Sequence, residues 1–158
     1  GPENADQKQI VLVSADERTS TSIGNRGLGV GMSAEITTND DLASVVESQM
    51  KAALGARGFA VVTGPNRNLH ELRIEVRNVQ YQVTPGIVTG HLRAEAALKG
   101  ICSFAGERRY EHLYRGESTE EVFLVQFAES NTKHLNTALS AAMSNIVADN
   151  SLMSCLTE

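Results

Sequence analysis

The chain has few aromatic side chains with which to build a core, and it has no tryptophan. Aromatic residues make up 4% of its 158 residues, whereas apolar residues as a whole reach 41%, which is usual for a globular protein. A chain of this length fits one domain and can bury enough surface to fold without a metal or a disulfide framework. We therefore expect a core made of Val, Leu, Ile, Ala and Met.

Clustered positive charge is also missing. Lys and Arg number 14 against 19 Asp and Glu, which gives a formal net charge of −5. The adjacent basic pair Arg108–Arg109 is flanked by Glu107 and Glu111. A nucleic-acid-binding protein needs grouped cations to displace counterions from phosphates, so we expect no nucleic-acid partner. Apolar runs are all far shorter than the roughly 18 residues that a membrane-spanning helix requires.

Motifs of catalysis and cofactor binding are absent as well. The glycine-rich stretch 22–31, SIGNRGLGVG, has the glycine spacing of neither a dinucleotide-binding fingerprint nor a Walker loop. It also lies too far before the next expected helix to hold a phosphate at that helix's N-terminus, so a flexible connection or a hairpin tip is expected. The histidines lack the short spacing of zinc ligands and are expected on solvated strand faces: His70, His91, His112 and His134. We predict no catalytic residue, no metal site and no cofactor.

What the chain does have is a regular alternation of apolar and polar residues. Along 72–83 the alternation changes phase by one residue after Asn78, which is typical of a β-bulge or of two separate strands. Turn residues at 84–86 and 105–106 separate this segment from the next two and predict an antiparallel meander. Shorter strands are expected at 10–13, 33–37 and 59–62.

Two segments carry the apolar stripe of an amphipathic helix, about 40–56 and about 131–149. Oxygen-bearing side chains at 38–41 are a helix-start signal for the first of them. Because each helix has a single stripe, each is expected to cover a sheet on one side. The predicted fold is α+β, with an antiparallel sheet of four to five strands and two helices packed on one face.

The other face of that sheet is predicted to be charged, and either solvated or offered to a partner. Alternation places five charged residues there: Arg73, Glu75, Arg93, Glu95 and Lys99. Asp16 and Arg18, two residues apart after the first strand, can pair with each other or with neighbouring strands. We select six candidate structural or partner-contacting residues: Asp16, Arg18, Asn25, Arg26, Arg73 and Arg93.

Cysteine is scarce, with only Cys102 and Cys155, which lie in different predicted elements. Their spacing is not that of a metal site. Two buried thiols, or one disulfide in an oxidising compartment, both fit the sequence.

The order of these elements resembles the YajG family of outer-membrane lipoproteins. The matching residues are Ala15–Thr19 after the first strand, Asp41-Leu42 at the start of a helix that closes in Ala56–Phe59, and Asn131–Asn150. The glycine-rich insert around 24–31 departs from the family pattern. The resemblance implies a protein on the periplasmic face of the outer membrane, held there by an N-terminal lipidated cysteine, with no known catalytic residue.

Gly1-Pro2 is typical of what a protease leaves after tag removal, and residues 1–8 are polar, so we expect them to be a tag remnant and a flexible tail. The resemblance implies that 9–156 form a single YajG-like domain. A periplasmic setting favours a disulfide between Cys102 and Cys155. The expected role is that of a non-enzymatic accessory or binding protein of the envelope, with an envelope protein, lipid or glycan as partner and a homo-oligomer as an option. The alternatives are a subunit of an envelope assembly or secretion complex that pairs through its sheet, and a hydrolase of envelope material.

Overall fold

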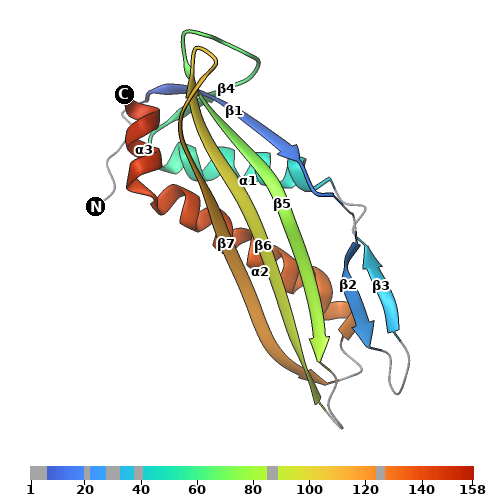
Figure 1. Ribbon diagram of the computed structural model, residues 1–158. Coiled ribbons are helices and arrows are strands. Elements are labelled where there is room, and N and C mark those ends of the chain that lie inside the picture. The colour runs from blue at the N-terminus through green and yellow to red at the C-terminus, as the bar shows by residue number, and fades with distance from the viewer. Residues whose placement is uncertain (1–6, 20–21, 28–32, 38–40, 85–88, 124–126) are drawn as a thin grey trace.

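The computed structural model describes residues 7–19, 22–27, 33–37, 41–84, 89–123 and 127–158 (Figure 1). Its strands are β1 (Gln9–Asp16), β2 (Ser22–Gly27), β3 (Ser33–Thr37), β4 (Ala60–Val62), β5 (His70–Thr84), β6 (Thr89–Phe104) and β7 (Glu107–Phe123). Its helices are α1 (Leu42–Ala56), α2 (Phe127–Ala148) and α3 (Asn150–Thr157). None of the described helices combines the length and the apolar character needed to cross a bilayer.

The main sheet has five strands in the order β4-β1-β5-β6-β7, and the helices lie on one side of it (Figure 1). Strands β5, β6 and β7 form the expected antiparallel meander. β1, however, runs parallel to both of its neighbours, β4 and β5. Parallel neighbours need a crossover connection, and the chain between β1 and β4 includes α1. The α+β prediction is confirmed, although the sheet is mixed and the described residues form three helices rather than two.

The change of phase in β5 is a β-bulge within one strand. Pairing with β6 runs up to Val76↔Leu98 and resumes at Asn78↔Ala97, so that Arg77 is the extra residue. The bulge keeps the apolar side chains of both halves of β5 on the helix side of the sheet. Leu72, Ile74 and Tyr81 are accordingly fully buried there.

The core lies between the sheet and the three helices. α1 begins at its N-cap Asp41, whose carboxylate accepts a hydrogen bond from the Ser44 amide at 3.1 Å. It buries Val46, Met50 and Leu54 against the sheet. Each such aliphatic side chain contributes roughly 1.5–3 kcal/mol when it is fully removed from water.

Helix α2 packs very closely on the sheet at Gly116 of β7. A methyl group built on Gly116 would lie 2.2 Å from the carbonyl oxygen of Ala138 and 2.4 Å from the amide nitrogen of Ala142. Only a glycine allows this approach, because the space that a side chain needs is occupied by the helix backbone. Asn145 of α2 also donates to the Arg115 carbonyl at 2.8 Å.

The C-terminal helical segment is two helices, divided at Asp149. The Asp149 carboxylate accepts hydrogen bonds from the amides of Ser151 and Leu152 and so caps α3. The other carboxylate oxygen accepts from the hydroxyls of Tyr110 and Tyr114, at 2.8 and 2.6 Å. These contacts tie the corner between α2 and α3 to β7, which explains why one apolar stripe does not continue as one helix.

A disulfide joins Cys102 of β6 to Cys155 of α3, with a Cα–Cα distance of 6.4 Å. Both residues are buried in the core. The bond therefore fastens the last helix to the middle strand of the meander.

The glycine-rich stretch contributes a strand. Its residues Ser22–Gly27 form β2, which pairs antiparallel with β3 in a separate two-stranded sheet. The expectation that all of 22–31 forms a flexible connection or a hairpin tip is therefore wrong for 22–27, and its remaining residues, 28–31, lie outside the described residues.

Candidate functional site

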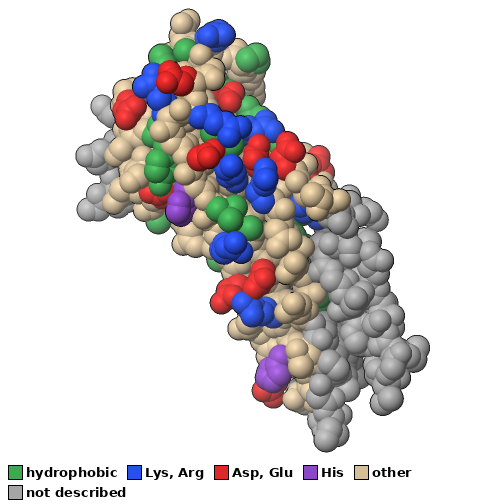
Figure 2. Space-filling view, viewed as in Figure 1, with side chains coloured by type: hydrophobic (Ala, Val, Ile, Leu, Met, Phe, Trp, Pro, Cys, Tyr) green, Lys and Arg blue, Asp and Glu red, His purple; other side chains and the backbone are tan. Residues whose placement is uncertain are grey.

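The side of β5, β6 and β7 that faces away from the helices, here called the outer face, is covered with charged groups (Figure 2). Strand register places on it all five charged residues that alternation predicts, among them Arg73, Glu75 and Lys99. Because cross-strand partners share a face, the neighbours of these residues on β7 lie there too, including Glu111, Leu113 and Arg115. The outer face is therefore built by three strands of 15 to 17 residues each.

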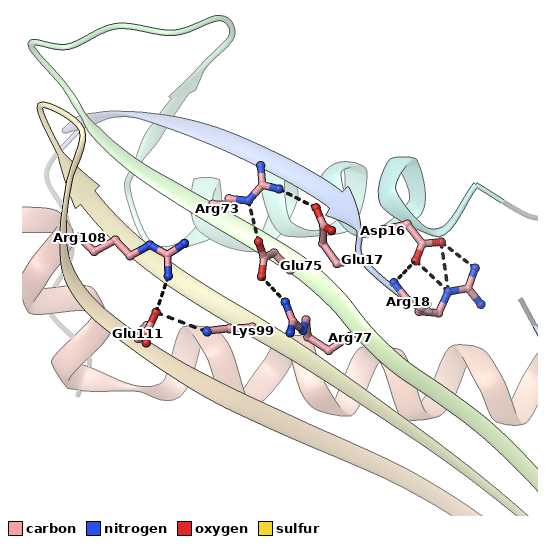
Figure 3. A network of polar contacts seen from close by, with 9 residues as sticks. All are labelled: Asp16, Glu17, Arg18, Arg73, Glu75, Arg77, Lys99, Arg108 and Glu111. Carbon is pink, nitrogen blue, oxygen red and sulfur yellow. Dashed lines mark hydrogen bonds and ion pairs between the residues drawn. The ribbon is translucent and has the colours of Figure 1, made fainter. Parts of the chain in front are cut away.

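The first ion-pair group on the outer face is centred on Glu75 (Figure 3). Its carboxylate accepts from Arg73 at 2.9 Å and from Arg77 at 3.0 Å, and Arg73 also reaches Glu17 at 2.9 Å. The Glu75 side chain is 10% exposed. Burial by itself would raise the pKa of Glu75, but the two guanidinium groups hold that pKa below its ordinary value. Glu75 thus stays ionised and fixes the two arginines.

Two further groups extend the pattern along the sheet. Glu111 contacts both Lys99, at 3.4 Å, and Arg108, at 3.1 Å. At the other end Arg93 bridges Glu95 and Glu117. Exposed pairs of this kind contribute little stability, about 0–1 kcal/mol each, but they order the charges in a fixed pattern that a partner can match.

Between these groups lies a small apolar centre. Leu113 is 39% exposed and is the one large hydrophobic side chain that is exposed among the described residues. Its register partner is Lys99, and its diagonal neighbours on β6 are Ala97 and Ile101, which are 4% and 2% exposed. A hollow of about 620 Å³ beside this centre is lined by Ala97, Arg115 and residues of the Arg93 group on the sheet, and also by Ala141 and Asn145 of α2.

The predicted pair of Asp16 and Arg18 forms, and it is bidentate. The Arg18 guanidinium donates to both carboxylate oxygens of Asp16, with Nη2 2.6 Å from Oδ2. These hydrogen bonds hold the pKa of Asp16 below its ordinary value, against a smaller opposing effect of burial. In Figure 3 the pair lies at the end of β1, whose last residue is Asp16, apart from the Glu75 group. Of the other candidates, Asn25 and Arg26 lie in β2, opposite Glu35 and Ala34.

Two histidines are buried, contrary to the expectation of solvated strand faces. His70 is 8% exposed and stacks on Phe104, with 4.7 Å between ring centroids. His134 of α2 is 4% exposed; its Nδ1 lies 2.8 Å from the Ser118 hydroxyl, and its Nε2 lies beside the Glu120 carboxylate. The sequence held no spacing signal for this contact, because β7 and α2 bring its members together only in the fold. The contact links β7 to α2.

Solved structures with the same fold include lipoproteins of distant sequence. A protein from Xanthomonas campestris is 12% identical with a TM-score of 0.60, and the match covers 99% of this chain and 88% of that one. A minor lipoprotein from Acinetobacter baumannii is 14% identical with a TM-score of 0.58, covering 93% and 92% of the two chains. At these identities the likeness concerns the fold. No curated protein matches the chain.

The sequence model of one family matches residues 2–157, which is almost the whole chain. The family is described as "Uncharacterized lipoprotein", in agreement with the resemblance to the YajG lipoproteins. The chain belongs to this family of uncharacterised lipoproteins.

Proposed function

We propose that this lipoprotein acts without catalysis as a binding protein on the periplasmic face of the outer membrane, and that a partner protein docks on the outer face of its sheet. The observation that carries the proposal is the apolar centre at Leu113 within a rim of ordered charges. Protein interfaces commonly have this plan, with an apolar centre that provides most of the affinity and a polar rim that provides selectivity.

The charges of the rim favour a protein over a nucleic acid or a uniformly charged glycan. Positive and negative groups alternate along the face, as Arg93, Glu117 and Arg115 illustrate. A polyanion would meet repulsion at every second group, whereas a protein surface can present the complementary pattern. Most of these carboxylates and guanidinium groups already have partners, so docking on them requires little rearrangement.

The alternative of assembly through the sheet edge has less support. β7 is an edge strand of the main sheet, but α2 lies directly on its middle, at Gly116, and Asn145 binds the Arg115 carbonyl. A second chain adding a strand along this edge would have to compete with Asn145 for the Arg115 carbonyl. The open face therefore supports binding better than this edge does.

The test is site-specific photo-crosslinking in cells that produce the full-length lipoprotein. A crosslinker at Leu113 should give a discrete protein adduct, and one at Glu47, an exposed residue of α1 on the helix side, should not. The Arg115→Glu variant should reduce the Leu113 adduct at least about tenfold, because it reverses one charge of the rim. Equal adducts from both positions, or adducts with lipid or glycan only, would contradict the proposal. Fatty-acid labelling of the same cells tests the lipid anchor.

A further inference from the structure

We infer that a second, smaller site at one end of the outer face binds the phosphate or carboxylate group of a small hydroxylated molecule. The site is a hollow of about 330 Å³ between the β4–β5 connection and the β6–β7 turn at 105–106. Three arginines from three different segments line it: Arg67 from the connection, Arg73 from β5 and Arg108 from β7. Ile101 and Ser103 of β6 line it between those strands.

Arg67 is the residue that makes the hollow suited to an anion. Its Nη2 donates to the carbonyl oxygen of Ala105 at 3.0 Å, which holds the guanidinium across the β6–β7 turn. Among the described residues, it forms no ion pair with a carboxylate. A guanidinium has five N–H donors in a fork that matches a carboxylate or phosphate, so Arg67 retains donors for a ligand.

Arg108 supplies the second cation from the opposite wall. Its side chain is 63% exposed, and its carboxylate partner, Glu111, is shared with Lys99. One carboxylate thus faces two cations, which leaves positive charge at this end of the sheet. Arg73 comes from β5 and Arg108 from β7, the strands on either side of β6 (Figure 3). Ser103 pairs in register with Arg108, so its hydroxyl lies on the same face as the guanidinium.

Glu71 defines what else the ligand must carry. It also lines the hollow and pairs in register with Ser103. Its carboxylate repels a bare anion but accepts hydrogen bonds from hydroxyl groups. The favoured ligand therefore has one anionic group, bound by Arg67 and Arg108, and neighbouring hydroxyls directed at Glu71. A phosphoglycerol group and a sugar acid both have this chemistry.

The experiment is an NMR titration with glycerol 3-phosphate and with inorganic phosphate. It follows the arginine Nε–H signals and the amides of 103–106. We expect saturable shifts at Arg67, Arg108 and these amides. Arg67→Ala and Arg108→Ala should each weaken binding about tenfold, as expected for loss of a charge-assisted hydrogen bond. Glu71→Gln should tighten binding of inorganic phosphate several-fold, because it removes a like charge.

Arg93→Ala is the matched control, since it removes the same charge from the same face at a distance from the hollow. Its affinity should stay within about twofold of the wild type. Equal weakening by Arg93→Ala would show that only net charge matters, and an unchanged affinity in Glu71→Gln would show that Glu71 does not face the bound anion; either result would overturn the site. Vesicles with and without phosphatidylglycerol distinguish a lipid headgroup from a free phosphate: vesicle binding that depends on Arg67 identifies the headgroup. Leu113 does not line the hollow, so failure here leaves the proposed function standing.

Discussion

Replacement of Gly116 by alanine should be among the most damaging small changes in the molecule. The added methyl carbon would lie 2.2 Å from the Ala138 carbonyl oxygen, and real methyl carbons hardly ever approach closer than 3.0 Å. The difference, 3.0 − 2.2 = 0.8 Å, is the least distance by which α2 and β7 must separate. Both close neighbours, Ala138 and Ala142, contribute backbone atoms, so no change of side-chain rotamer can relieve the overlap.

Overpacking of a core costs about 1–3 kcal/mol, and a clash with backbone belongs at the upper end of that range. We therefore expect Gly116→Ala to lower the free energy of unfolding by about 3 kcal/mol. For a chain of this size that corresponds to a fall of roughly 6–12 °C in the melting temperature. The loss includes the weakened hydrogen bond from Asn145 to the Arg115 carbonyl.

Urea unfolding monitored by circular dichroism measures this difference, with Gly55→Ala as the control. A methyl group on Gly55 of α1 would have nothing within 4 Å, and alanine is the better helix former by up to about 1 kcal/mol. Gly55→Ala should therefore stabilise the protein slightly while Gly116→Ala destabilises it. If the free energy of unfolding of Gly116→Ala differed from that of the wild type by less than about 0.5 kcal/mol, the close packing of α2 on β7 would be refuted.

Two further predictions concern the C-terminal helices. Asp149→Asn should cost about 2 kcal/mol at pH 7, since hydrogen bonds to a charged acceptor are worth about 1.5–3 kcal/mol. Burial alone would raise the pKa of Asp149, but the hydrogen bonds from Tyr114 and Tyr110 hold it below its ordinary value. Their stabilising effect is complete above the unfolded-state pKa, about 4, and is lost as the pH falls through the lower folded-state pKa. Acid titration of stability should show this loss in the wild type and not in Asp149→Asn. Replacing both Cys102 and Cys155 by alanine should lower stability by up to about 4 kcal/mol for a closed loop of this length, and intact mass after alkylation without reductant should show no modified thiol in the wild type.

Local sequence patterns predicted those helices and strands that have one solvent-exposed face and one buried face. The bulge at Arg77 could be predicted because the apolar residues move from even to odd positions there. The charged face could be predicted for the same reason, since Arg73 and Glu75 share a parity. The stripe Val46, Met50 and Leu54 likewise predicted α1.

The remaining features depend on partners far away in the sequence. Nothing local to β1 specifies that it pairs parallel with β5. The second half of β7 lacks clear alternation because Ser118 and Glu120, on its helix side, are polar and contact His134 of α2. α3 is only eight residues long, and its separation from α2 depends on Asp149 meeting two tyrosines of β7. Leu113 shares the outer face with its charged neighbours Glu111 and Arg115, but its own side chain is apolar. Its exposure therefore became clear only from the strand register.

The position of α2 on β7 also bears on the order of events during folding. α2 begins at Phe127, directly after β7 ends at Phe123, and its contact with Gly116 closes a short loop of chain. β1 must instead find β5 across a much longer separation, from Ile10 to His70. Short loops close sooner because they lose less chain entropy. We therefore expect α2 to pack on the meander before β1 completes the sheet, which limits the time during which the apolar face of an unfinished chain is exposed and can aggregate.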